Sequence, residues 1–199
     1  MKFNKIPETT FQQLQLNAGI LLSSFTPSTA TVDNNAIIGA TTGGVEFSAT
    51  PEYSDFGEDI DNAPKNMKEL KRLDNWTVEM SGTFVTVDGN SIKTMIGAAD
   101  IDKSDSTHIV PRNDLVDGDF TDLWWVGDYS DKNGESKGGY LAIHMMNTLS
   151  TGGFAIQTTD GGKGNFAFTF TAHYSMDAQE TVPFEVFVKA GEAEAVGGV

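Results

Sequence analysis

The stretch Phe166-Ala-Phe-Thr-Phe-Thr-Ala-His-Tyr174 decides the fold class, because large and small side chains alternate along all of it. The aromatic side chains fall on one side and the small or polar ones on the other, a period of two that is typical of a half-buried β-strand. Residues 154–159 alternate as well, and Asp160-Gly-Gly-Lys-Gly164 between the two segments has the composition of a tight turn. The sequence therefore predicts a β-hairpin whose second strand buries an aromatic face.

Further strands are predicted along the chain. Residues 45–50, 76–84 and 184–188 alternate with the period of a strand, and residues 122–129 and 140–146 are strand candidates with apolar side chains on both faces. Gly82 within the second of them is expected to mark a β-bulge. A helical period follows Asp88-Gly-Asn90 only, with apolar residues at Ile92, Met95, Ile96 and Ala99. Many strands and one short helix predict a mainly β fold, a β-sandwich or partly closed barrel of two packed sheets with one flanking α-helix.

The length of 199 residues suits one domain with a substantial core, which we place at residues 19–190. Residues 1–18 are polar at first and predict an N-terminal arm, and residues 191–199 predict a flexible C-terminal tail. Within the domain, residues 51–75 predict a long extended loop in which an acidic run passes directly into a basic one. An irregular stretch of this length inside a compact domain is typically functional.

Composition excludes several kinds of chemistry. The chain has no cysteine, so disulfides, thiolate metal sites and cysteine nucleophiles are impossible. The formal net charge is −15, no Lys or Arg occurs between Lys5 and Lys65, and Lys163 is the only cation from Gly139 to Val188. This distribution argues against tight DNA binding, which needs many cations against phosphates, although acidity also simply favours solubility. The sequence predicts neither a signal peptide nor a membrane-spanning segment.

No catalytic, metal-binding or cofactor-binding set is predicted, so we do not expect an enzyme. The three histidines lack zinc spacing, and the acidic run at 58–61 lacks the ligand pattern of a calcium loop. Glu46 and Glu79 can face each other across a sheet, but a chain with 28 acids offers many such pairs. Trp124 and Trp125 point to opposite faces of a strand, so we expect one in the core and the other exposed, as an interface anchor or a sugar-stacking surface.

Three stretches resemble a known family. They are Asn17-Ala-Gly-Ile-Leu-Leu-Ser-Ser-Phe25, Gly39-Ala-Thr-Thr-Gly-Gly-Val-Glu-Phe-Ser-Ala-Thr-Pro51, and the acidic-to-basic loop that ends at Trp76. Over most of residues 11–90 the chain is similar to the major tail (tail tube) proteins of siphophages and related prophages. The resemblance implies a structural virion protein that polymerises as stacked sixfold rings around a continuous inner β-barrel, the conduit for DNA ejection.

The resemblance also implies partners and surfaces. The partners would be further copies of the chain and other tail proteins (tape measure, terminator and baseplate or tip), with DNA passing without adhesion, no membrane and no cofactor. Assembly in the host bacterial cytoplasm and a place in the virion tail follow from it. The candidate inter-subunit contacts are Phe11, Leu14, Phe56, Asp59, Ile60, Asp61, Lys65, Lys68, Lys71 and Arg72. The candidate lumen-facing residues are Thr169, Thr171 and His173. A capsid decoration protein or other virion β-protein is the main alternative, and a carbohydrate-binding module a further one.

Overall fold

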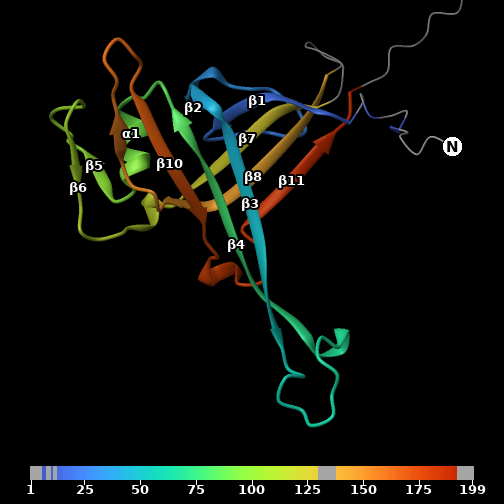
Figure 1. Ribbon diagram of the computed structural model, residues 1–199. Coiled ribbons are helices and arrows are strands. Elements are labelled where there is room, and N and C mark those ends of the chain that lie inside the picture. Colours follow the sequence, from blue (N-terminus) through green and yellow to red (C-terminus); the bar gives the residue numbers. More distant parts are fainter. Residues whose placement is uncertain (1–5, 8–9, 11–12, 130–137, 192–199) are drawn as a thin grey trace, which may run out of the picture.

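Strands predominate in the described part of this computed structural model, residues 6–7, 10, 13–129 and 138–191, and the predicted mainly β fold is confirmed (Figure 1). The strands are β1 (Gln15–Leu22), β2 (Ile37–Gly39), β3 (Thr41–Asp55), β4 (Lys71–Phe84), β5 (Ala99–Ile101), β6 (Ile109–Pro111), β7 (Thr121–Tyr129), β8 (Gly139–Ser150), β9 (Ala155–Gln157), β10 (Asn165–Ala172) and β11 (Phe184–Lys189). One α-helix, α1 (Gly89–Ile96), accompanies them in these residues.

The large sheet folds over into two layers. Its strand order is β2-β1-β7-β8-β10-β4-β3, with β11 paired to β8 and β9 paired to β10, while β5 and β6 form a small second sheet. β8 belongs to both layers, because most of it pairs with β7 and β11 and its last residues, Thr148 to Ser150, pair with β10. We call β3, β4, β9 and β10 the β10 layer and the remaining strands of this sheet the β8 layer. The two packed sheets expected from the sequence are thus two layers of one sheet, which does not close into a barrel.

The core lies between the two layers. Phe168 and Phe170 of β10 are 2% and 1% exposed, and the ring of Phe168 packs on that of Phe84 with centroids 4.4 Å apart. Trp125 and Met145 face them from the β8 layer. The aromatic side of β10 is therefore the buried side, as its alternation predicts, whereas Tyr174 beyond the end of the strand is 38% exposed. The hairpin formed by β9 and β10 is confirmed as well.

The helix predicted after Asp88 is confirmed, and Asp88 caps its first turn. The Asp88 carboxylate accepts hydrogen bonds from the backbone N–H and the hydroxyl of Ser91, each at 2.7 Å. These bonds hold the pKa of Asp88 below its ordinary value of 3.8. The helix ends before Gly97, which has a φ of 84°, so Ala99 lies in β5 and not on the helical stripe where its spacing had placed it.

The predicted bulge at Gly82 is wrong in its position. The register passes from Thr42 opposite Thr83 to Val45 opposite Gly82, so the extra residues are Gly43 and Gly44 of the neighbouring strand. Gly82 is needed for space instead, because a Cβ there would lie 2.8 Å from Cζ of Phe168.

The prediction of an irregular stretch over residues 51–75 is wrong at both ends. β3 and β4 continue past the body as a two-stranded ribbon, in which Tyr53 pairs with Leu73 and Asp55 with Lys71 (Figure 1). A loop with one 3₁₀ turn (Lys68–Leu70) joins the two strands. Apart from Trp76 at its base, which packs on Phe184, neither face of this ribbon is covered by the body, so its residues lack the alternation by which a strand is recognised. We call residues 51–76 the ribbon.

The predicted N-terminal arm, residues 1–18, overlaps the first strand. β1 begins at Gln15, so the last residues of the predicted N-terminal arm belong to the sheet. Phe11 lies outside the described residues, as does the predicted tail apart from Gly191.

Candidate assembly surfaces

The ribbon carries a concentration of exposed apolar side chains. Five of its large apolar residues are between 37% and 58% exposed: Tyr53, Phe56, Ile60, Met67 and Leu73. The backbone of Phe56 is held at the start of the loop, where its N–H donates to the carbonyl of Leu70 at 3.0 Å. Such a surface is typical of an interaction site, since it adds nothing to the core of its own domain.

The charged side chains of the ribbon are exposed and only loosely paired. Asp59, Asp61, Lys65, Lys68, Lys71 and Arg72 are all exposed. Lys68 lies 3.5 Å from Glu69, and Arg72 lies 3.7 Å from Asp74. Ion pairs this open to water contribute little to stability. The ribbon residues predicted as inter-subunit contacts are therefore together on one accessible element, available to a partner.

Leu14, the remaining described candidate contact, lies elsewhere. It is 38% exposed and immediately precedes β1, which starts at the end of the body away from the tip of the ribbon (Figure 1). The structure therefore separates the N-terminal candidate from the ribbon candidates.

A second surface is the outer face of the β10 layer, where small polar side chains line up across three strands. The cross-strand rows are Ala167, Thr83 and Thr42; Thr169, Ser81 and Glu46; and Thr171, Glu79 and Ser48. We call these nine residues the polar face. It contains hydroxyls and two carboxylates and no Lys or Arg. Thr169 and Thr171 were predicted from their own strand, but their neighbours depend on register, which the sequence does not reveal.

His173 is set apart from the polar face. It lies just beyond the end of β10, and its ring packs edge-on against Phe120 with centroids 5.4 Å apart. Its Nδ1 lies 3.2 Å from the carbonyl oxygen of Asn147. Of the three predicted lumen-facing residues, two are thus side by side on the face and the third packs at its border.

The two neighbouring tryptophans are both buried, so the expectation that one is exposed is wrong. Trp124 and Trp125 are each 8% exposed, on opposite faces of β7. Trp125 lies in the core between the layers and its indole N–H donates to the carbonyl of Ala18 at 3.0 Å. Trp124 stacks on His144 with centroids 4.0 Å apart, beside Phe25. Neither indole therefore offers the open face that a sugar ring would need.

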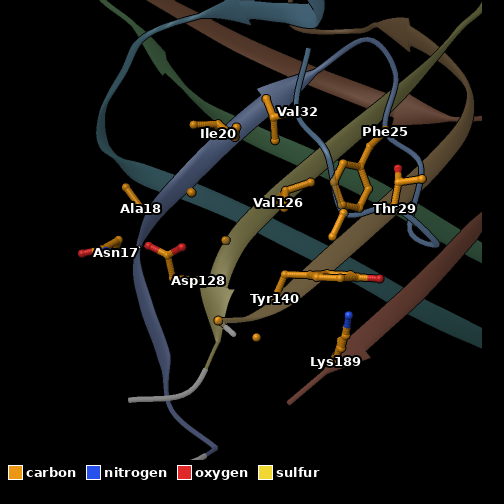
Figure 2. Close-up of a pocket in the computed structure, with 15 residues that line it drawn as sticks. Asn17, Ala18, Ile20, Phe25, Thr29, Val32, Val126, Asp128, Tyr140 and Lys189 are labelled. Atoms are coloured by element: carbon orange, nitrogen blue, oxygen red, sulfur yellow. Dashed lines mark hydrogen bonds between the residues drawn. The ribbon is translucent and has the colours of Figure 1, made fainter. Parts of the chain in front are cut away.

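A cavity of ≈ 610 Å³ lies against β1, β7 and the start of β8 (Figure 2). Three of its polar side chains are already engaged: Asn17 donates to Asp128 at 2.7 Å, and Tyr140 donates to the carbonyl of Pro27 at 2.7 Å. Lys189 reaches toward it from β11 (Figure 2). The first hydrogen bond joins β1 to β7 and the second holds the turn after β1 against β8, which is a structural role.

Within the described ranges, no three His, Cys, Asp or Glu side chains come together in a way that could hold a metal ion. None of the helices described is both long and apolar enough to cross a membrane. Glu46 and Glu79 occupy diagonal positions on the polar face, both exposed on an open sheet.

Comparisons of the chain with family models and with curated proteins give no match.

Proposed function

We propose that this chain is a structural subunit that self-assembles into rings and that the rings stack into the tail tube of a long-tailed bacteriophage. The observation that carries the proposal is the ribbon. It extends the two longest strands away from the body and exposes five large apolar side chains to water. A monomer gains nothing from such an element, whereas burying those side chains in a neighbouring copy stabilises an assembly by about 25 cal/mol for each Å².

The polar face supports the same function as the wall of a conduit. Its carboxylates repel phosphates, and it has no cations that would hold DNA by ion pairs. Its side chains are short, which leaves a smooth surface. DNA would then pass along it without adhesion, as genome ejection requires.

The edges of the β10 layer support ring closure. Among the described residues β3 pairs only with β4, and β9 pairs only with β10, so both outer strands of this layer have an unpaired edge. A long unpaired edge such as that of β3, which has 15 residues, promotes association between chains. Pairing β3 of one copy with β9 of the next would continue the layer around a ring, with the polar faces turned inward.

Other tail components (tape measure, terminator and baseplate or tip) would then be the further partners, and the virion tail, assembled in the bacterial cytoplasm, the location. No catalytic role is part of the proposal. A capsid decoration protein is the second candidate, because exposed apolar side chains equally suit binding to an existing lattice. A carbohydrate-binding module is disfavoured by the burial of Trp124 and Trp125.

Negative-stain microscopy of the purified chain at high concentration tests the proposal. Rings or tubes are expected, and a particle that stays monomeric would overturn it. A decoration protein would bind a capsid lattice without polymerising. In a second sample, residues 54–72 are replaced by Asn-Gly, a two-residue turn that suits the pairing of Tyr53 with Leu73. This variant should fold and fail to assemble, and unchanged tubes would exclude the ribbon as an assembly element.

A further inference from the structure

A pocket lies on the body beside the base of the ribbon. Its volume is ≈ 410 Å³, and its lining includes Phe120, His173, Tyr174 and Met176. Met176 is 86% exposed and Tyr174 is 38% exposed, so apolar surface is open to water at this pocket too. This volume is large enough for one aromatic side chain and the residues adjacent to it in sequence.

The pocket is acidic. Asp117 and Asp177 line it, and no Lys or Arg does. The nearest cation along the chain, Arg112, is committed elsewhere: its guanidinium lies 2.7 Å from Asp100 and 2.5 Å from Asp119. Burial pushes the pKa of Asp119 up, but the Val116 N–H and Arg112 outweigh it and leave that pKa below 3.8. Arg112 therefore does not neutralise the carboxylates of the pocket.

The ribbon has the complementary character. Between Lys65 and Arg72 there are four cations and a single acid, Glu69. Phe56 is placed beside this basic segment, because its backbone N–H bonds to Leu70 and the preceding Asp55 pairs with Lys71. An exposed aromatic ring next to exposed cations matches an apolar pocket edged by carboxylates.

The tip of the ribbon cannot reach the pocket of its own molecule. The hydroxyl of Tyr174 accepts a hydrogen bond from the backbone N–H of Trp76 at 3.0 Å, which places the pocket where the ribbon leaves the body. From Trp76 to Lys71 the paired strand then runs outward for about 17 Å, at roughly 3.3 Å for each residue. The side chains at the tip point to a different copy.

We infer that the tip of the ribbon, residues 56–72, docks in trans into this acidic pocket of a second copy, with Phe56 as its anchor. The inference rests on the proposed self-assembly and names the two surfaces that would meet. Because the tip and the pocket are different surfaces, the contact is head-to-tail, so each copy both gives and receives one ribbon. Contacts of this kind propagate into rings or filaments.

Cysteine cross-linking tests the pairing, since the chain has no cysteine of its own. Phe56→Cys and Met176→Cys are made in separate chains, mixed and mildly oxidised. In the control mixture, Met176→Cys is replaced by Ser106→Cys, an exposed position on the body. The yield of the covalent dimer between Phe56→Cys and Met176→Cys is expected to exceed the yield between Phe56→Cys and Ser106→Cys by at least about tenfold. Equal yields with both partners would overturn the inference, and so would no cross-link in a mixture that forms rings.

Charge reversal supplies a second test that does not remove the anchor. Lys68→Glu and Asp177→Lys should each raise the protein concentration needed for assembly, by up to about fivefold for an exposed pair. Combining the two should restore it to within about twofold of the original chain. A combined variant as poor as the worse single one would refute the pairing. If the unmodified chain forms no rings at all, the proposed function fails as well, so the two failures are distinguishable.

Discussion

The replacement Phe56→Ala separates the stability of the fold from the stability of the assembly. Phe56 is 58% exposed, and an aromatic side chain can bury about 200 Å². About 115 Å² of it therefore remains for a partner to cover. At about 25 cal/mol for each Å², that surface contributes close to 3 kcal/mol when it is buried. The alanine side chain still buries part of this area, so the replacement should weaken one contact between copies by about 2 kcal/mol of binding free energy.

A loss of about 2 kcal/mol raises the critical concentration for assembly by about 30-fold. Light scattering over a concentration series measures that concentration, and microscopy identifies the particles. The free energy of unfolding should change by less than about 0.5 kcal/mol, because the side chain lies on the surface of the monomer. Urea titration followed by tryptophan fluorescence measures it on the unassembled protein.

Val110→Ala is the matched control, since Val110 is 41% exposed on β6 of the body. It should leave both quantities nearly unchanged. The reasoning is wrong if the Phe56→Ala variant assembles within twofold of the concentration that the original chain needs. It is also wrong if Val110→Ala raises that concentration as much.

Three further predictions concern the core, the helix cap and the polar face. Phe168→Ala should lower the free energy of unfolding, measured by urea titration, by about 3–5 kcal/mol, because its ring is buried between the layers. Phe154 is exposed, so Phe154→Ala should lower the free energy of unfolding by less than about 1 kcal/mol. Equal losses in the two variants would count against the layered core. Asp88→Ala should cost about 1 kcal/mol at neutral pH. The pKa of Asp88 is lowered in the fold, so the stability that its carboxylate contributes is present above pH 3.8 and is lost as the pH falls through the lowered value. In the variant, the free energy of unfolding should therefore fall less steeply with decreasing pH in that range. An unchanged pH dependence would contradict the role of the cap. Glu46→Lys combined with Glu79→Lys should make assembled particles co-sediment with duplex DNA in a salt-dependent way, and DNA that stays in the supernatant would argue against this face as the lumen wall.

The candidate surfaces were predictable only in part. The ribbon residues could be identified because charged and apolar side chains occur together in a long stretch without core periodicity. The polar face could be recognised on β10 alone, where Thr169 and Thr171 alternate with phenylalanines. Its extension to Glu46 and Glu79 depends on the pairing of strands far apart in the chain. Register of this kind is decided by the fit of whole strands and turns.

The acidic pocket was missed entirely. His173 and Phe120 are 53 positions apart, and nothing in the local pattern of either residue indicates that they meet. Pockets form where separate elements approach each other, so a sequence pattern has no local signal for them.

By itself the sequence determined the positions of the longer strands of the body, the apolar side of the alternating ones and the presence of one short helix after Asp88, because periodicity acts over a few residues. It did not reveal β1, β2, β5 or β6, which are short or lie in segments without a clear alternation. Only the tertiary structure decided that residues 51–55 and 71–75 pair as a ribbon, that both Trp124 and Trp125 are buried, and that one sheet supplies both layers. Each of these depends on what covers a face or an edge. For Trp124 the cover comes from Phe25, a residue 99 positions away in the chain, and contacts over such separations are set by the packing of the whole domain.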